Sequence, residues 1–492
     1  MTARQVVVIG GGLAGVTSAI GLREAGFDVT VLEARPRLGG AASSFARGDL
    51  TIDNGQHVFL RCCTSYQDLL ARLGVSDLVT MQERFDVTVL SAHGEARLRR
   101  TALPGPLHMG RALTGYRLLS LGERLKVARA ALALRSVDPA DPAIDSVALG
   151  DWLASKGQSE RARRMLWDLF IVSALNIEGD AASLALSATV IKMALLGKKD
   201  AADIGMAAAP LGDLHGRAAA DLLGKLGAQI RLGAKATAVE RLPGGGFRIR
   251  LTGGGTGQHD GAGPVAGGRE PDGREPDGPE ADGPALVADG VVLAVPPGQA
   301  ARLAGTAGLD GASRWTDLGA SPIVNVHVVY DRQVTSLPFA AAVDSPVQWV
   351  FDKTRSSGLA AGQYLAVSLS AADTYVEIPA ASLRRQFLPA LEQIFPAAAG
   401  ARVTDFFVTR ERRATFRQAP GIGALRPGTA TSVPGFVLAG AWTDTGWPDT
   451  MEGAVRSGQH AAGELTRWLA SQPAPNGAWR RETATARTGA SS

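Results

Sequence analysis

The sequence predicts an α/β fold, α+β overall, in which a parallel-sheet domain is interleaved with a second domain of helices and strands. Three observations predict it. A strand–glycine–helix–strand pattern opens the chain, a buried strand and a glycine-containing helix follow more than 400 residues later, and a helical stretch with three strand-like runs lies between them. A chain of 492 residues is long enough for two or three domains. Its 45% apolar and 20% charged residues are typical of a globular protein.

The opening pattern begins with an apolar strand over Gln5 to Ile9 and continues with glycines that match G-x-G-x-x-G in Gly10 to Gly15. A helix runs from Leu13 to Glu24, and a second strand over Phe27 to Leu32 ends on Glu33. A strand, glycines, a helix, a second strand and an acid in this register predict a dinucleotide-binding βαβ unit rather than a merely structural glycine turn.

Each of these residues has a physical task in holding a dinucleotide. Gly10 permits a tight turn, Gly12 lets the backbone approach a pyrophosphate, and Gly15 lets the helix pack closely on the strand. The helix N-terminus offers free N–H groups and the positive end of a dipole. A carboxylate at Glu33 can accept both ribose hydroxyls of an adenosine, and it would repel a 2′-phosphate.

The run from Leu32 to Gly40 resembles the flavin signature of the amine oxidase and carotenoid desaturase superfamily. The resemblance implies that FAD is the cofactor and that Glu33 and Arg35 contact it. Many members carry an arginine directly after the paired glycines, where this chain has Ala41. We therefore expect a Rossmann-like FAD-binding domain of the amine oxidase and phytoene desaturase type, without that arginine's contact to phosphate.

Near the other end, a buried strand from Phe436 to Thr443 precedes a helix-like run from Pro448 to Gly458. This run resembles the helix that closes on the flavin in carotenoid desaturase-like enzymes, which implies that its N-terminus approaches the flavin ring and ribityl chain. A helix dipole there stabilises negative charge on a reduced flavin. The family usually has an acid after the strand glycine, where this chain has Ala441, so we expect backbone contacts to FAD at that point.

Two further segments resemble parts of the same domain. Val291 to Pro297 resembles its returning strand, and Ile230 to Glu240 resembles the strand whose backbone meets the adenine near Ala236. The cofactor-binding residues that the motifs and the resemblance together predict are Gly10, Gly12, Leu13, Ala14, Gly15, Glu33, Ala34, Arg35, Gly39, Gly40, Gly55, Gln56, His57, Ala236, Gly440, Ala441, Met451 and Glu452.

These segments predict a discontinuous FAD-binding domain over residues 1–75, 212–310 and 415–470, and a substrate and membrane-facing domain over residues 76–211 and 311–414. Residues 253–283 hold 11 glycines, 4 prolines, 7 acids and a repeated Gly-Arg-Glu-Pro-Asp. Such a stretch cannot bury enough apolar surface to offset its ordering entropy. We expect a disordered insertion there, either passive expansion or a functional linker, and a flexible tail over residues 472–492.

The segment from Asp53 to Phe59 is more specific. With Cys62-Cys63 nearby, and with Trp442-Thr443 and Thr450 to Ala454 at the other end, it resembles the hydroxysqualene dehydroxylases of bacterial hopanoid synthesis. The resemblance implies that hydroxysqualene, a long-chain isoprenoid, reacts with a reduced acceptor to give squalene, water and the oxidised acceptor. Hydride would come from N5 of reduced FAD. The leaving hydroxyl then needs a proton donor.

The candidate proton donors are His57, Glu452 and Asp53. His57 comes first because its pKa lies nearest neutrality and its motif should sit beside the flavin. Each has a structural alternative. His57 can hold a loop near FAD, Asp53 can brace the turn at Gly55, and Glu452 can cap the closing helix or bond the ribityl chain.

The stretch between Arg97 and Arg135 is strongly basic, with nine Lys and Arg residues and one acid, Glu123, among Leu, Met and Tyr. It suits a helix on an anionic membrane surface, and equally an ordinary amphipathic helical pair. No nucleic-acid motif accompanies the charge, so no nucleic-acid partner is expected. We find no signal peptide and no apolar run of roughly 18 residues.

The two cysteines are adjacent, which favours neither a disulfide framework nor a metal site and fits a reducing compartment. We therefore expect a cytoplasmic protein, peripheral at the inner face of the cytoplasmic membrane, with no bound metal. The oligomeric state is left open.

Three rival functions remain open at this point. A carotenoid-type desaturase would use the same pocket but take hydride from the substrate to FAD. An amine oxidase usually has an aromatic cage beside the flavin, which Trp442 and Trp447 could imitate. A non-catalytic FAD-folded scaffold would deliver isoprenoids to partner enzymes.

Overall fold

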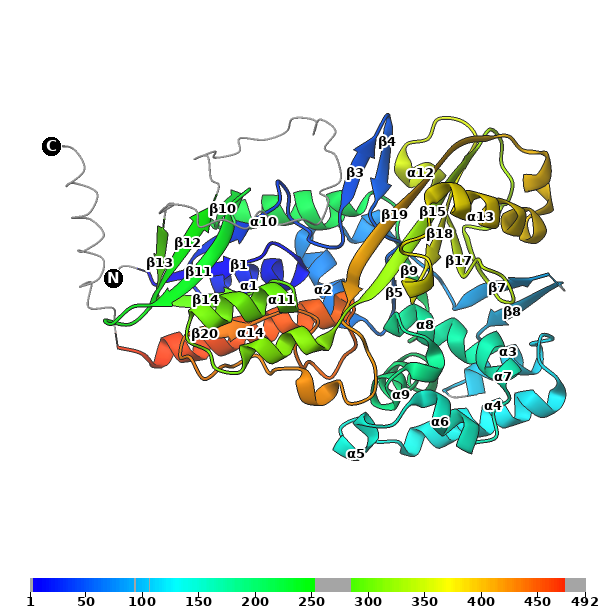
Figure 1. Ribbon diagram of the computed structural model, residues 1–492, viewed down its shortest axis with the longest axis horizontal. Helices are drawn as coiled ribbons and strands as arrows, with labels where there is room; N and C mark the ends of the chain where they lie inside the picture. Colours follow the sequence, from blue (N-terminus) through cyan, green and yellow to red (C-terminus); the bar gives the residue numbers. More distant parts are fainter. Residues whose placement is uncertain (1–2, 93, 106, 253–284, 474–492) are drawn as a thin grey trace.

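A computed structural model describes residues 3–92, 94–105, 107–252 and 285–473. Figure 1 shows an elongated molecule. One half is a parallel sheet with helices against it. The other half is a large, mostly antiparallel sheet above a group of short helices.

The first half is built on a five-stranded parallel sheet with the order β10-β2-β1-β14-β20. Its strands are β1 (Gln5–Ile9), β2 (Asp28–Glu33), β10 (Gln229–Leu232), β14 (Gly290–Leu293) and β20 (Phe436–Leu438). Three of them, β1, β14 and β20, are nearly continuous apolar runs, which is typical of parallel strands covered on both faces.

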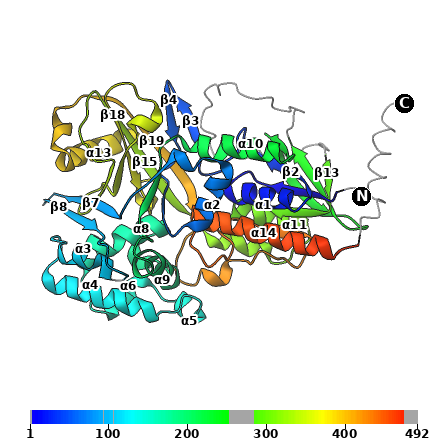
Figure 2. The same cartoon turned by 180° about the vertical axis from the view of Figure 1, so that it is seen from behind.

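Different elements cover the two faces of this sheet. Val6, Val8 and Val31 face helices, whereas Val7 and Ile9 face a small antiparallel sheet and a further helix. The helices on the first face are α1 (Leu13–Glu24), α2 (Thr64–Leu73), α10 (Ala218–Lys225) and α14 (Met451–Ser471). The elements on the second face are β11 (Lys235–Arg241), β12 (Phe247–Thr252), β13 (Ala285–Ala288) and α11 (Pro297–Thr306). Figure 2 shows α1 and α14 from behind, lying along each other.

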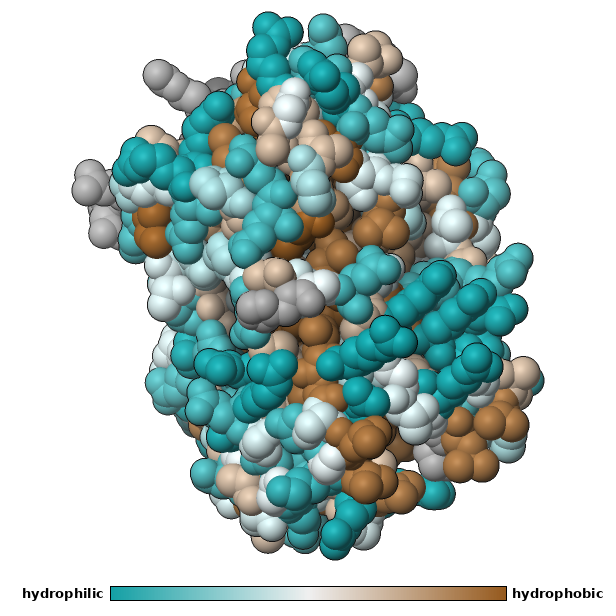
Figure 3. All heavy atoms as spheres, turned by 90° about the vertical axis from the view of Figure 1, so that its right-hand side faces the viewer, coloured by the Kyte–Doolittle hydropathy of each residue, from teal (hydrophilic) through white to brown (hydrophobic). Residues whose placement is uncertain are grey.

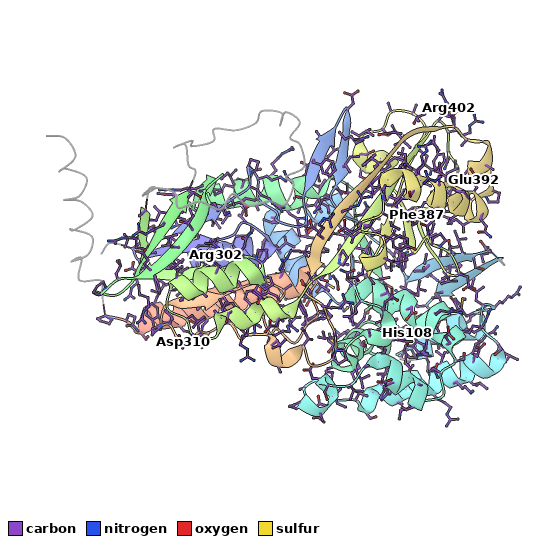
Figure 4. All side chains as sticks on the ribbon, viewed as in Figure 1. His108, Arg302, Asp310, Phe387, Glu392 and Arg402 are labelled. Atoms are coloured by element: carbon purple, nitrogen blue, oxygen red, sulfur yellow. The ribbon has the colours of Figure 1, made fainter. Side chains whose placement is uncertain are left out.

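The second half contains a seven-stranded sheet with the order β19-β15-β18-β17-β16-β7-β8. Its strands are β7 (Asp86–Ser91), β8 (Gly94–Arg99), β15 (Ser321–Tyr330), β16 (Phe339–Ala342), β17 (Trp349–Asp352), β18 (Gln363–Leu369) and β19 (Val403–Thr415). Helix α13 (Ala380–Ile394) packs on one face through Leu383 and Phe387, and Phe387 is labelled in Figure 4.

Below this sheet lies a group of short helices between residues 110 and 196. They are α3 (Gly110–Thr114), α4 (Leu121–Ala133), α5 (Pro142–Asp145), α6 (Leu149–Ser155), α7 (Glu160–Ala162), α8 (Asp168–Leu175) and α9 (Leu184–Ile191), with π-helical turns over Arg163–Trp167 and Lys192–Leu196. Gly197 follows the last of these turns and ends the group.

Small strand pairs join the two halves. β3 (Ser44–Arg47) pairs with β4 (Leu50–Asp53), and β9 (Ile204–Ala207) lies between β5 (Val58–Leu60) and β6 (Val79–Met81). The segment that follows the glycine-rich start is therefore fixed to residues far along the chain. The domain limits drawn from the sequence stay predictions.

The predicted fold class is confirmed, and the helix from Leu13 to Glu24 is observed with those bounds. The single strand expected over Ile230 to Glu240 is wrong, because Gly233 adopts φ +67° and separates β10 from β11. Strand β13 was not expected. The insertion at 253–283 and most of the tail at 472–492 lie outside the described residues, although Gln472 and Pro473 accept hydrogen bonds from Arg4.

Candidate functional site

The turn between β1 and α1 admits only glycine at two positions. Gly10 has φ +110°, and a Cβ there would lie 2.2 Å from the carbonyl oxygen of Ala294. A Cβ on Gly15 would lie 1.9 Å from the carbonyl oxygen of Gly10. The turn therefore brings the start of α1 directly over the end of β1. The first N–H groups of α1, at Leu13 and Ala14, have no acceptor within the helix and can bind an anion.

Glu33 ends β2 beside this turn. Its carboxylate accepts hydrogen bonds from the N–H groups of Gly11 (2.7 Å) and Arg35 (2.8 Å), and the residue is 8% exposed. These donors fix the direction of the carboxylate. Each oxygen keeps a free lone pair, so that the carboxylate can still accept a ribose hydroxyl.

The start of β11 is bonded to the same corner. The N–H of Ala234 donates to the carbonyl of Glu33 (3.0 Å), and the N–H of Gly233 donates to that of Arg35 (3.1 Å). Ala236 follows two residues later, at a point where the pairing of β11 with β12 shifts register. The predicted adenine strand thus begins next to the predicted ribose carboxylate.

The second glycine pair closes over the first. The N–H of Gly39 donates to the carbonyl of Gly11 (2.9 Å), and a Cβ on Gly40 would lie 2.9 Å from the Cα of Gly12. Arg37 extends from this loop toward the hydroxyl of Ser43, 3.5 Å away. Its Nε is buried without a hydrogen-bond partner, and burial lowers the pKa of its guanidinium, with Arg35 contributing to the same shift. The Nε–H of Arg37 thus has no hydrogen-bond acceptor within the protein. A phosphate oxygen is an acceptor that suits it.

The C-terminal elements reach the same end of the sheet. Gly440 follows β20 with φ +143° and donates its N–H to the Oγ of Ser457 in α14 (2.8 Å). Gly458 allows α14 to touch α1, because a Cβ there would lie 2.4 Å from the carbonyl of Ala14. Thr450 caps α14 by accepting the N–H of Gly453 (3.2 Å). Ala441 and Met451 therefore flank this end of the fold.

Glu452 is occupied by protein groups. Its carboxylate accepts the N–H groups of Ser65 (3.2 Å) and Tyr66 (2.8 Å) at the start of α2, and it pairs with Arg456 Nε (2.7 Å). The residue is 1% exposed. A charged carboxylate at a helix N-terminus is stabilised by the dipole as well as by these donors. This geometry favours a role in joining α14 to α2 over proton donation.

The carboxylate of Asp53 is also bound by protein groups. It accepts Ser44 Oγ (2.7 Å) and the N–H of Leu211 (2.9 Å), and it pairs with Lys353 Nζ (2.9 Å). These contacts bind the strand before Gly55 to two distant segments. The carboxylate is therefore placed as a brace, one of the alternatives that the sequence left open.

His57 is half-buried, and its ring folds back so that Nε2 lies 3.2 Å from where a Cβ of Gly55 would be. Burial lowers the pKa of His57, Asp53 opposes this, and Lys353 adds to it. The ring is neutral at neutral pH in consequence. Gln56 beside it has a buried Nε2 without an acceptor. A cofactor or substrate oxygen would satisfy that donor.

Two buried charged groups near the C-terminal loop were not predicted from the sequence. Arg426 is 8% exposed, and its guanidinium donates to the carbonyls of Ala441 (3.1 Å), Trp442 (3.3 Å) and Trp447 (2.8 Å), and also to that of Thr443. It fixes the loop between β20 and α14. No local motif signals this, because the carbonyls lie 15 to 21 residues further along the chain.

The second missed position is Asp449. Burial raises the pKa of Asp449 to about 6, against a hydrogen bond from the N–H of Phe416 (2.9 Å) and the charge of Arg426. It directly precedes the Thr450 cap. Its carboxyl group therefore lies beside the N-terminus of α14.

The two tryptophans of the suggested cage are occupied by protein contacts. Trp442 is buried, donates to the carbonyl of Val295 (3.0 Å) and packs against Trp315 at 5.3 Å between ring centroids. The ring of Trp447 lies under the guanidinium of Arg456 at 4.8 Å. Neither ring pairs with the other in a cage.

Comparison with known proteins agrees with this geometry. The model of the flavin containing amine oxidoreductases matches residues 13–466. The chain belongs to the flavin-containing amine oxidoreductase family. It is an FAD-dependent oxidoreductase. The first N–H groups of α1 and the buried nitrogens of Arg37 and Gln56, which lack acceptors, fit that dinucleotide.

Among characterised relatives, a hydroxysqualene dehydroxylase of Rhodopseudomonas palustris is 30% identical over 467 residues, which cover 93% of this chain and 97% of that enzyme. A hydroxysqualene dehydroxylase of Sinorhizobium fredii is 29% identical over 475 residues, with the same coverage. A zeta-carotene desaturase of Zea mays is 25% identical over 505 residues, which cover 93% of this chain and 82% of that enzyme.

Among solved structures, cyclohexylamine oxidase of Brevibacterium oxydans superimposes with a TM-score of 0.67 at 20% identity, over 95% of this chain and 100% of the other. This likeness concerns the fold. None of the helices in the described part of the chain is long and apolar enough to cross a membrane.

Proposed function

We propose that this flavoenzyme converts hydroxysqualene to squalene and water. The observation that carries the proposal is the match of 30% identity along 93% of the chain to a hydroxysqualene dehydroxylase, higher than its match to the carotene desaturases. The substrate is an isoprenoid alcohol drawn from a membrane. The reaction takes place in the cytoplasm, at the inner face of the cytoplasmic membrane.

The reaction needs a hydride, a proton and a dry apolar site. The reduced flavin supplies the hydride. The carbon–oxygen bond breaks as the hydroxyl takes up a proton and leaves as water, and the hydride replaces it on carbon. Atoms and charge balance, because one hydride and one proton are consumed for each alcohol.

In this mechanism the chain holds FAD through Glu33, Arg37 and the N–H groups that begin α1. Its apolar helical half excludes water from the substrate. Asp449 holds the proton, since it is the carboxyl group of the site whose pKa lies near neutrality. His57, neutral at that pH, donates a hydrogen bond in the site, while Asp53 and Glu452 position the loops around it.

The match to zeta-carotene desaturases supports an alternative function as a desaturase. In that reaction hydride passes from the substrate to FAD. Product analysis separates the two. Dithionite-reduced enzyme with hydroxysqualene in detergent micelles should yield squalene, identified by mass after extraction. Unchanged alcohol, together with new double bonds formed from a polyene by the oxidised enzyme, would support the desaturase.

A further inference from the structure

The large apolar side chains that remain exposed are concentrated at one place. Outside it, Val58 is the only such residue in the part of the chain that the structure describes. We call this group the leucine face: Leu103, Leu107, Leu121, Leu125, Leu132 and Met193, which are 42–72% exposed. A cluster of this kind on a soluble protein marks a contact surface for another apolar body.

Helix α4 supplies half of the leucine face. Leu121, Leu125 and Leu132 are four and seven residues apart, so they lie on one side of the helix. Val127 and Ala130 are buried on the opposite side, where the helix meets the protein. The leucines therefore point away from the body of the molecule. A helix that only packs on its own protein has polar residues at such positions.

The other members of the face lie on segments that approach one another and α3, and α3 in turn contacts α4. A Cβ on Gly105, between Leu103 and Leu107, would lie 2.1 Å from the carbonyl of Gly197, which follows the turn that carries Met193. Arg124 of α4 donates to the carbonyl of Leu119 (2.8 Å) and also to that of Thr114, which ends α3. Figure 3 shows apolar side chains gathered on the lower part of the side that faces the viewer.

Five exposed cationic side chains lie on and beside the helices that carry the leucine face. Arg111, Arg117, Lys126, Arg129 and Arg135 are exposed, and none forms an ion pair with any residue that the structure describes. Glu123, the single acid between Arg97 and Arg135, accepts hydrogen bonds from Ser120 and Ser159. The surface is thus an apolar patch within a ring of free cations.

Not every arginine of this stretch belongs to the ring. Arg97 and Arg99 pair with Asp86 at 2.6 and 3.1 Å. Arg100 pairs at 2.6 Å with Asp203, which is fully buried. These three cations stabilise the protein itself, so a variant at Arg100 would test folding rather than surface binding.

We propose that the leucine face docks on an anionic phospholipid bilayer, with the leucines among the acyl chains and the ring of cations at the lipid headgroups. Apolar area and cationic charge together give such a surface its affinity. That the docked protein draws its substrate from the bilayer beside α4 rests on the proposed function. The docking itself is independent of that function.

The first experiment measures docking alone. FAD-loaded full-length protein is sedimented with phosphatidylcholine vesicles that contain or lack phosphatidylglycerol. We expect binding only with the anionic lipid, and a loss of about tenfold or more in the Leu121→Ser/Leu125→Ser variant. Lys126→Glu/Arg129→Glu should lose binding similarly, whereas the matched reversal Arg355→Glu/Arg385→Glu, on α12 (Thr354–Ser357) and α13 at the far edge, should not. Equal binding by all variants would overturn the proposal.

A second experiment separates this proposal from the proposed function. Parent and leucine variant are given hydroxysqualene in detergent micelles or in anionic vesicles. Equal turnover in micelles with loss in vesicles only for the variant supports docking. No turnover by the parent in micelles contradicts the proposed function and leaves the sedimentation result to decide on docking. A parent dimer that the leucine substitutions split, seen by sedimentation velocity, would overturn docking in favour of contact between copies.

Discussion

Arg37 and Gln56 each bury a nitrogen that has no acceptor, Nε in one and Nε2 in the other. An unsatisfied buried donor costs about 1–3 kcal/mol, so proteins rarely keep one without a reason. Both residues lie in the segments that surround the glycine turns. We propose that FAD supplies the missing acceptors, phosphate oxygens for Arg37 and polar ring atoms for Gln56.

Removing the Arg37 side chain should weaken FAD binding. A hydrogen bond to a charged group contributes about 1.5–3 kcal/mol, so we expect Arg37→Ala to raise the Kd for FAD by about 10- to 100-fold. Titration of the apoprotein with FAD, followed by flavin fluorescence, measures it. Arg248→Ala, an exposed arginine on β12, is the control. A Kd equal to that of the control would remove Arg37 from the cofactor site.

Variants at Asp449 and His57 distinguish the two residues by the pH dependence of turnover. If Asp449 holds the proton, turnover declines as pH rises through about 6, the value to which burial raises the pKa of Asp449. Asp449→Asn should then lower turnover by about 100-fold and leave it independent of pH between 5 and 8, since general acid catalysis contributes roughly 10²–10⁴-fold. His57→Ala should keep the decline. The reverse pattern would assign the proton to His57.

At the scale of elements, the crossing of α1 and α14 decides whether the cofactor fold closes. These helices begin at Leu13 and Met451, and they touch through Gly458 against Ala14 and through Gly21, where a Cβ would lie 3.0 Å from Ala462. Backbone-to-backbone contact leaves no room for a side chain at Gly458. The closeness of the helices sets the position of both N-termini, which face the same end of the sheet.

Gly458→Val should therefore separate the helices. A side chain 2.4 Å from a backbone oxygen cannot be relieved by a rotamer change. We expect a lower Tm and loss of FAD at equal protein concentration, by at least about 3 kcal/mol of unfolding free energy. Gly463→Ala on the same helix has open space, and should stabilise slightly because alanine favours helix by about 1 kcal/mol over glycine. Similar Tm values for both variants would contradict the packing account.

The same elements show what the sequence alone could predict. Local rules predict the turn at Gly10, the extent of α1 and the position of Glu33, because strand, turn and helix signals there are adjacent in the chain. The roles of Glu452, Arg426 and Asp53 depend on partners that are distant in sequence. Glu452 meets Tyr66, for example, 386 residues away. Such pairs arise only when the fold brings the segments together.

At the scale of the whole molecule, buried histidines link stability to pH. His215 is hydrogen-bonded to Tyr66 (2.8 Å), and burial lowers its pKa to about 4. His327 lies between Tyr364 (2.7 Å) and Thr409 (3.0 Å), and burial lowers its pKa to about 3. Both are neutral in the fold but take up protons when unfolded below pH 6.5. Their contribution to stability is therefore complete above 6.5 and is lost as pH falls.

Burial raises the pKa of Asp168 to about 7 and that of Asp449 to about 6, so these groups act in the opposite sense. The test therefore compares the free energy of unfolding of the parent with that of a histidine variant at two pH values. The stability advantage of the parent over His327→Gln should shrink by about 2 kcal/mol between pH 7 and pH 5. Urea unfolding at the two pH values measures it, with the exposed His460→Gln as control. An advantage that does not change with pH would mean that His327 has the same pKa in the folded and in the unfolded chain.

A single anaerobic turnover tests most directly whether hydride passes from the reduced flavin to the substrate. The purified flavoprotein is photoreduced and mixed with hydroxysqualene in micelles. Flavin absorbance is then followed, and the extracted lipid is identified. We predict that the flavin reoxidises with one squalene formed for each flavin. A flavin that stays reduced beside unchanged alcohol would contradict the account.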